Sequence, residues 1–107
     1  MKVINRIKKY EEFQKVINEG QNLRVNTFNC YFLKNELNLT RFGISIPKKS
    51  GNAVIRNKMK RQIRAAIALK CNYKTPLDIV LIARNKYDIG NFEQTKADIE
   101  EILKKVG

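Results

Sequence analysis

The stretch VIRNKMKRQIRAAI, residues 54–67, carries five cationic side chains and no anionic one. Three of the five, Arg56, Lys60 and Arg64, are spaced four residues apart, so on a helix they would lie along one side and repel one another. A helix that needs only solubility gains from acidic residues at this spacing instead. Arginine also suits phosphate, because its planar guanidinium donates two hydrogen bonds to one group. The spacing therefore favours a helix that binds a polyanion.

An ordinary amphipathic helix is the alternative interpretation of the same residues. At about 100° per residue, one side of the helix collects four apolar residues that we expect to be buried: Met59, Ile63, Ala66 and Ile67. A neighbouring side collects polar residues: Asn57, Lys60, Arg61 and Arg64. Taken alone, this pattern fits a solvated helix as well as it fits a phosphate-binding one.

The distribution of charge along the chain favours the second interpretation. The formal net charge is +12, and residues 38–76 hold no Asp or Glu but ten cations: Arg41, Lys48, Lys49, Arg56, Lys58, Lys60, Arg61, Arg64, Lys70 and Lys74. Because clustered like charge destabilises a compact chain, this segment predicts an anionic partner. We expect nucleic acid rather than a membrane, since the helix has no bulky aromatic face to insert into lipid. Lys48 and Lys49 stand beside a turn at Gly51 that leads into the helix N-terminus, where backbone N–H groups also favour anions.

The residue types that perform catalysis in protein sites are scarce in this chain. It contains no histidine, which removes Ser-His-Asp and Cys-His catalysis and most transition-metal sites. Cys30 and Cys71 form no C-x-x-C motif, so we expect two reduced, half-buried thiols. The basic segment also lacks the carboxylates that a metal-dependent nuclease requires. These absences argue against those classes of catalytic site, and we expect no metal or other cofactor bound by the protein itself.

We expect one cytoplasmic domain that spans residues 1–107. This length is enough for one core, and no apolar run approaches the roughly eighteen residues of a membrane span. The N-terminal stretch MKVINRIKKYEEF is basic and lacks the apolar segment of a secretory signal.

Helical spacing predicts two further helices that position the basic one. The first should cover residues 10–19 and end at Gly20 in a left-handed cap. The last should cover residues 91–106, with Asn91 as its N-cap.

Alternating apolar residues predict the strands. We expect strands over 26–34 and 40–47, joined by a hairpin loop into an antiparallel pair. A short strand at 53–54 is also expected, followed by a strand over 77–83 that is covered on both faces. The element order indicates an α+β fold in which helices pack on a small mixed sheet.

RNA is a better candidate partner than DNA. The sequence offers no helix-turn-helix or zinc framework of the kind that presents a DNA-reading helix. Structured RNA offers phosphates for docking and unpaired bases for stacking. Phe13 on the first helix and Tyr31 on the first predicted strand are candidates to line a cleft for such bases, although a phenylalanine at this spacing is more often a core residue.

The segment ISIPKKSGNAVIRNKMKRQIRAAI resembles the signature of the bacterial ribonuclease P protein component. That family carries the run K-K-x-G-x-A-V-x-R-N-x-x-K-R-x-x-R. The run matches here without a gap at Lys48, Lys49, Gly51, Ala53, Val54, Arg56, Asn57, Lys60, Arg61 and Arg64. The likeness extends to RIKKYEEFQKVINEG near the start and to DIVLIAR near the end.

The resemblance implies a subunit of a ribonucleoprotein endonuclease that removes the 5′ leader from precursor tRNA. In that family the catalyst is a large RNA that uses Mg²⁺, and the protein contributes no cleaving residue. The resemblance implies that Lys60, Arg61 and Arg64 dock on the catalytic RNA, with Arg56 and Asn57 nearer the substrate. It also implies a left-handed β-α-β crossover around the basic helix, against the usual right-handed rule.

The resemblance further places Phe13, Ile17 and Tyr31 along a cleft through which the single-stranded leader passes. Two residues depart from the family pattern. Ile17 stands where a second aromatic is common, and it can pack against a base without stacking as a ring does. Tyr10 replaces an Asn that is common just before the first helix, so the N-cap expected there is missing.

Two other functions are open on sequence alone. A ribosomal or other structural RNA-binding protein would share the basic helix but would take no part in cleavage. A self-sufficient protein nuclease fits poorly, because the basic half of the chain has no carboxylate cluster for metal ions.

Overall fold

The elements follow one another in the order α1 (Tyr10–Glu19), β1 (Gln21–Arg24), β2 (Phe28–Lys34), β3 (Arg41–Ser45), the 3-10 turn η2 (Lys48–Ser50), α2 (Ala53–Lys70), β4 (Leu77–Ala83) and α3 (Phe92–Val106). The computed structural model describes residues 5–106, so residues 1–4 of the basic N-terminal stretch and Gly107 lie outside the described part. The expected α+β class is confirmed. Within the described part, no helix is both long enough and apolar enough to cross a membrane.

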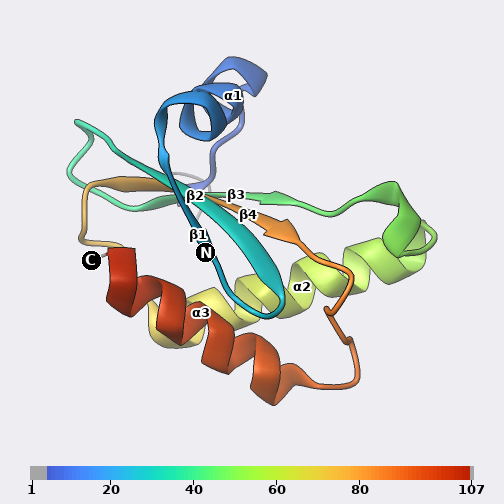
Figure 1. Cartoon of the computed structure of the whole chain (residues 1–107). Coiled ribbons are helices and arrows are strands. Elements are labelled where there is room, and N and C mark those ends of the chain that lie inside the picture. The colour runs from blue at the N-terminus through green and yellow to red at the C-terminus, as the bar shows by residue number, and fades with distance from the viewer. Residues whose placement is uncertain (1–4, 107) are drawn as a thin grey trace.

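The four strands form one mixed sheet in the order β1-β2-β4-β3. Strands β1 and β4 run antiparallel to β2, whereas β3 runs parallel to β4. Helix α1 covers one face of the sheet, and α2 and α3 pack side by side against the other face (Figure 1). The basic helix therefore lies in the layer opposite α1.

The main core fills the space between the sheet and the layer of α2 and α3. Its fully buried members include Phe28, Cys30, Ile63, Ile67, Ile79, Leu81, Ile99 and Ile102. Burial of this apolar surface is the dominant favourable contribution to the placement of α2 on the sheet.

The expected antiparallel pairing of residues 26–34 with 40–47 is wrong. Strand β4 lies between β2 and β3, with Tyr31 and Gly43 as the Cα partners of Val80 on its two sides. All residues of β4 except Ile82 are buried, so this strand takes the centre of the sheet. The polar loop after β2 consequently crosses the end of β4 instead of forming a hairpin.

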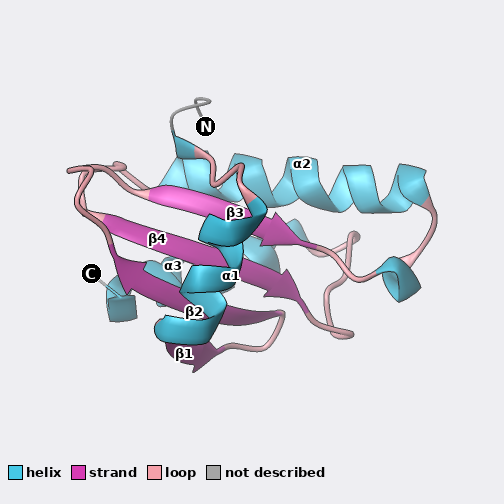
Figure 2. Ribbon diagram, turned by 90° about the horizontal axis from the view of Figure 1, so that it is seen from above, coloured by secondary structure: helices cyan, strands magenta, loops and turns pink. Residues whose placement is uncertain are grey.

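The parallel strands β3 and β4 are connected through α2. Figure 2 shows both strands pointing the same way, with α2 on the far side of the sheet. When the strands are turned upright, β4 lies to the right of β3 while the helix lies behind, so the crossover is left-handed. This unit departs from the right-handed rule that about 98% of such connections follow. The hand implied by the family resemblance is confirmed.

The sequence pattern does not predict β1. Only Leu23 of this short strand is shielded from solvent, and β1 forms the edge of the sheet, so it has no apolar alternation to detect. The side-chain amide of Asn22 donates to Asn29 Oδ1 at 2.6 Å and to the Cys30 carbonyl at 3.1 Å, which ties β1 to β2.

The short strand expected at 53–54 is also wrong, because α2 begins at Ala53. Asn52 caps the helix, since its Oδ1 accepts a hydrogen bond from the Ile55 N–H at 3.0 Å. This cap stabilises the start of the helix despite the strand preference of Val54, and α2 continues without interruption to Lys70.

The left-handed cap expected at Gly20 is wrong as well. Gly20 has φ −79° and ψ 171°, which is extended backbone, and its N–H donates to the Val16 carbonyl at 2.8 Å. A Cβ at this position would collide with the backbone of Val16 and Phe32. Close approach of two backbone segments, rather than a positive φ, accounts for the glycine.

The predicted N-cap of α3 is present in the structure. Asn91 Oδ1 accepts a hydrogen bond from the Gln94 N–H at 3.1 Å, so the predicted cap is confirmed.

Both cysteines are free, and Cys71 is half-buried as expected, but Cys30 is fully buried in the core. Burial raises the pKa of the Cys30 thiol to about 12, so this thiol stays protonated near neutral pH.

Candidate nucleic-acid interface

Helix α2 turns its predicted apolar side toward the sheet. Its buried residues are those of the expected stripe, each at most 3% exposed: Met59, Ile63, Ala66 and Ile67. Asn57 and Arg61 are exposed, whereas Arg56, Lys60 and Arg64 are half-buried. Cationic side chains beside a buried stripe can cover apolar surface with their stems and keep the charged ends accessible.

Most cations of α2 have no acidic partner within residues 5–106. Lys70 is the exception, because it forms an ion pair with Glu100 of α3 at 3.1 Å. No ion pair is found in the described part of the chain for Arg56, Lys58, Lys60, Arg61 or Arg64. The acidic residues of the described part therefore do not offset the repulsion that the spacing of these cations predicts.

A small basic pocket lies where α2 passes the β3 edge of the sheet. Its volume is about 120 Å³, and it is lined by Arg6, Ile7, Phe42, Gly43, Ile44, Lys60 and Arg64. The segment before α1 brings Arg6 here by pairing with β3, since the Ile7 N–H donates to the Phe42 carbonyl at 2.9 Å. Sequence reasoning missed Arg6, because no periodicity in the flanking residues indicates this long-range contact.

Two guanidinium groups of this pocket have unused hydrogen-bond donors. The Nε atoms of Arg6 and Arg64 are buried, and neither has a hydrogen-bond partner within the described residues. Burial, and secondly the charge of Arg6, lower the pKa of Arg64 below its ordinary value. A buried donor without an acceptor costs free energy that a bound anion would recover. The pocket therefore has the chemistry of a site for a phosphate group.

Replacing Arg64 with Met should stabilise the isolated protein and weaken its binding to RNA. The change removes a buried unpaired donor and the repulsion from Arg6, so the free energy of unfolding should rise by about 1 kcal/mol. It also removes a phosphate contact, so the slope of log K against log salt should become shallower by about one unit. Urea unfolding and RNA binding at several salt concentrations measure the two effects.

Lys104→Met is the matched control for this variant. Lys104 is 75% exposed on α3 and pairs with Glu100 at 3.4 Å, so its loss removes the same charge away from the pocket. We expect this control to leave the salt slope close to that of the parent protein. A destabilised Arg64→Met protein with an unchanged salt slope would show that this guanidinium serves the fold and not RNA.

The turn before α2 presents the two lysines selected from the sequence. Lys48 and Lys49 lie in η2 and are exposed. Gly51 has φ 150°, a conformation that residues with a side chain rarely adopt, and it redirects the chain into α2. Arg56 Nε donates to the Gly51 carbonyl at 3.2 Å and so braces the turn against the first turn of the helix. Both lysines therefore stand beside the helix N-terminus.

The three residues expected to line a leader cleft lie on the other face of the sheet. Phe13 and Ile17 come from α1 and Tyr31 comes from β2, and all three are half-buried. Phe13 lies over Gly43, where an added Cβ would come within 2.8 Å of the ring. Tyr31, Val80 and Gly43 are neighbours on adjacent strands, because Tyr31 and Gly43 are both Cα partners of Val80. Tyr31 therefore lies at one end of this row, and Phe13 lies over Gly43 at the other end. The fold thus brings two distant aromatic residues to one surface.

Gly43 also connects this surface with the basic pocket. It lies beneath Phe13 and at the same time lines the pocket with Lys60 and Arg64. A strand of nucleotides that follows the α1 side of the sheet would therefore reach the cations of α2 at the β3 edge.

The groups that this interface offers are hydrogen-bond donors, cations and aromatic rings. Such groups suit phosphates and bases rather than a metal ion. Within residues 5–106, no three His, Cys, Asp or Glu side chains gather closely enough to hold a metal.

Comparison with known proteins decides the family. A family model described as Ribonuclease P matches residues 1–107. The chain belongs to the ribonuclease P protein family. A ribonuclease P protein component from Mesoplasma florum is 41% identical to it over 99 residues, which cover 91% of this chain and 90% of that relative.

Solved structures of ribonuclease P proteins have the same fold. The protein from Staphylococcus aureus superposes with a TM-score of 0.85 at 36% identity, covering 95% of this chain and 94% of that one. The protein from Thermotoga maritima gives a TM-score of 0.75 at 30% identity, covering 92% of both chains. Membership of this family makes the chain a protein component of an endoribonuclease complex and implies an RNA partner.

Proposed function

We propose that this chain assists the RNA subunit of ribonuclease P in removing the 5′ leader from precursor tRNA. The protein binds the catalytic RNA along the cationic side of α2 and the single-stranded leader along the surface between α1 and the sheet. By placing cations between two polyanions it lowers their repulsion, so the Mg²⁺ sites of the catalytic RNA form at lower salt. The RNA and its Mg²⁺ perform the hydrolysis, and no side chain of this chain takes part in bond cleavage.

One observation carries the proposal: cations without acidic partners in residues 5–106 adjoin a surface that bears two aromatic side chains. Phosphates on α2 would offset the repulsion among its cations, and unpaired bases would stack on the rings. In this arrangement Lys60, Arg61 and Arg64 contact the catalytic RNA. The cations and amide closer to the start of α2 contact the substrate or adjacent RNA: Lys48, Lys49, Arg56 and Asn57.

Reconstitution tests this function directly. Purified protein is added to the catalytic RNA and a precursor tRNA at low Mg²⁺, and the appearance of the released leader is followed over time. We expect cleavage to become faster when the protein is present. No gain in cleavage, together with tight RNA binding, would favour a structural or ribosomal RNA-binding protein instead.

Tyr31→Ala should weaken binding of a leader-bearing precursor by about 1 to 3 kcal/mol, the range for loss of base stacking on a ring. Binding of mature tRNA to the same holoenzyme should change little, because mature tRNA has no leader to stack. Equilibrium binding of the two RNAs to the reconstituted enzyme measures the difference.

Tyr31→Phe serves as the control for this prediction. It keeps the ring and removes only the hydroxyl, so it should retain most of the affinity for the precursor. An equal loss of affinity for mature tRNA in Tyr31→Ala would contradict a role in leader binding.

A further inference from the structure

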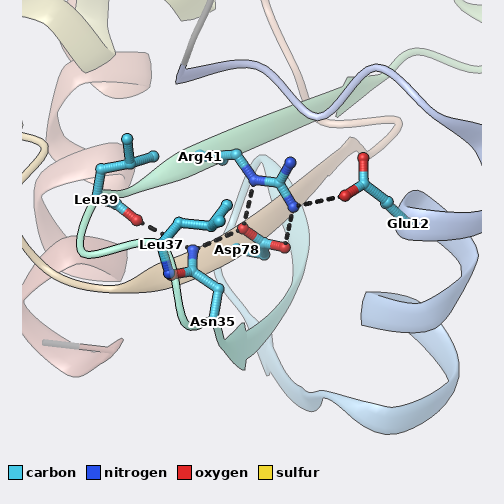
Figure 3. A network of polar contacts seen from close by, with 6 residues as sticks. All are labelled: Glu12, Asn35, Leu37, Leu39, Arg41 and Asp78. Carbon is cyan, nitrogen blue, oxygen red and sulfur yellow. Dashed lines mark hydrogen bonds and ion pairs between the residues drawn. The ribbon is translucent and has the colours of Figure 1, made fainter.

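Arg41, the first residue of β3, links three elements on the α1 side of the sheet (Figure 3). Its Nε and Nη2 donate to the two carboxylate oxygens of Asp78 on β4, at 2.9 and 2.7 Å. Nη2 also donates to Glu12 of α1 at 3.2 Å. The side chains of Arg41 and Asp78 are only 14% and 10% exposed, so this network is largely shielded from solvent.

The network neutralises Arg41, so this residue does not add to the positive charge that is available to bind RNA. Arg41 is one of the ten cations from which the sequence predicts an anionic partner, yet two carboxylates of the protein itself neutralise it. The hydrogen bond to Asp78 raises the pKa of Arg41 further above its ordinary value. The guanidinium therefore acts as a permanently charged tie between the sheet and α1.

Helix α1 has few other attachments to the sheet. Val16 is its only buried residue, and Phe13 packs over Gly43. Within residues 5–106, the bond from Arg41 to Glu12 is the only side-chain hydrogen bond that joins α1 to the sheet. Lys9, at the N-cap position, provides no side-chain cap. The first turn of α1 thus depends on Glu12 for its polar anchor.

Glu12 and Ile17 lie on opposite flanks of α1, with Phe13 and Val16 between them on the side that faces the sheet. At about 100° per residue, Glu12 and Ile17 are separated by about 140° around the helix axis, and Val16 points at the sheet between them. A bond that holds the Glu12 flank against β3 therefore fixes the tilt of the helix. That tilt sets how Phe13 and Ile17 face Tyr31.

We propose that Glu12 is a positioning residue for the leader: through Arg41 and Asp78 it sets the height and tilt of α1 above the sheet. The inference rests on the function proposed above, because it assumes that the leader binds between α1 and the sheet. Without the bond, Val16 and Phe13 still attach the helix, but its tilt is less restricted. Leader binding should therefore weaken while the fold persists.

The test compares Glu12→Ala with Glu11→Ala in the reconstituted holoenzyme. Glu11 is exposed, lies in the same first turn and has no ion pair within the described residues. Both variants lose one carboxylate and the same favourable interaction with the helix dipole, but only Glu12→Ala loses the bond to Arg41. Relative to Glu11→Ala, we expect Glu12→Ala to bind leader-bearing precursor about threefold to fivefold more weakly, with no difference for mature tRNA.

Glu12→Gln and Glu11→Gln provide a second, milder pair. The amide oxygen of Glu12→Gln can still accept a hydrogen bond from Arg41, so its affinity for the precursor should lie between those of the parent and Glu12→Ala. Thermal unfolding confirms that each variant is folded at the assay temperature. If Glu12→Ala does not fold, the glutamine pair decides the question.

Two outcomes would overturn the positioning role: equal affinity of the paired variants for the leader-bearing precursor, or an equal loss on mature tRNA. The parent protein is measured in the same assay. If the parent itself confers no leader-dependent gain in affinity, the proposed function fails and the positioning role fails with it. If the parent confers that gain and the paired variants do not differ, only the positioning role fails.

Discussion

Replacing Ile63 with Ala is expected to lower the free energy of unfolding by about 2 to 5 kcal/mol. Ile63 is 0% exposed and belongs to the core between α2 and the sheet. Truncation leaves a cavity that the neighbouring side chains fill only in part, so the cost includes lost packing as well as lost apolar burial. Urea unfolding followed by circular dichroism measures the change.

Leu69→Ala is the matched control, because Leu69 lies on the same helix but is 65% exposed. Its truncation should change the stability by no more than about 0.5 kcal/mol. The comparison also bears on the RNA interface, since the rotation of α2 that buries Ile63 also sets the direction of its cations. If the two variants lost similar amounts of unfolding free energy, α2 would have to be rotated about its axis relative to this structure. The assignment of its RNA-binding side would then be wrong.

Local patterns in the sequence were sufficient for most helices and strands. The expected helix over 10–19 and the expected strand over 77–83 match α1 (Tyr10–Glu19) and β4 (Leu77–Ala83). The apolar stripe of α2 is buried as its spacing predicts. These signals are strong because one face of a helix, or both faces of a central strand, must exclude water over several residues.

Strand pairing was not predictable from the same patterns. The polar loop between β2 and β3 is compatible with a hairpin and equally with a crossing over the end of another strand. The choice depends on which strand takes the centre of the sheet, and β4 does so because nearly all of its side chains are buried. Which strand takes the centre depends on contacts between segments far apart in the chain, so a short stretch of sequence cannot predict it.

The candidate site was predictable to the extent that charge is a local property. Charge and spacing selected the cations of α2, and in the described part of the chain most of them lack acidic partners. Arg6 was missed and the partners of Arg41 were not anticipated, because both depend on contacts between distant segments. The individual contacts of the cations with RNA, and of Phe13, Ile17 and Tyr31 with the leader, stay predictions.

Asp78→Asn is expected to destabilise the protein by about 3 to 5 kcal/mol, the usual cost of breaking a buried ion pair from one side. Asp78 accepts three hydrogen bonds, two from Arg41 and one from the Asn35 amide at 2.8 Å. An amide has only one oxygen, so its NH₂ group must face at least one of these donors. Arg41 would also keep a single carboxylate partner, Glu12, whose side chain is 39% exposed. Urea unfolding measures the loss.

Two further variants separate this explanation from a general sensitivity of the fold. Asp88→Asn should be nearly neutral, because Asp88 is exposed and the one hydrogen bond that its side chain accepts within residues 5–106, from the Gly90 N–H at 2.8 Å, can be made by an amide oxygen. The double change Arg41→Met/Asp78→Leu should recover most of the stability lost in Asp78→Asn, since no buried charge remains at the pair and only the half-buried Asn35 amide, which still donates to the Leu39 carbonyl, loses an acceptor. The double variant should nevertheless bind the leader weakly, because Glu12 has lost the partner that holds α1 against the sheet. Recovery of stability together with full leader affinity would show that the ion network serves only the fold.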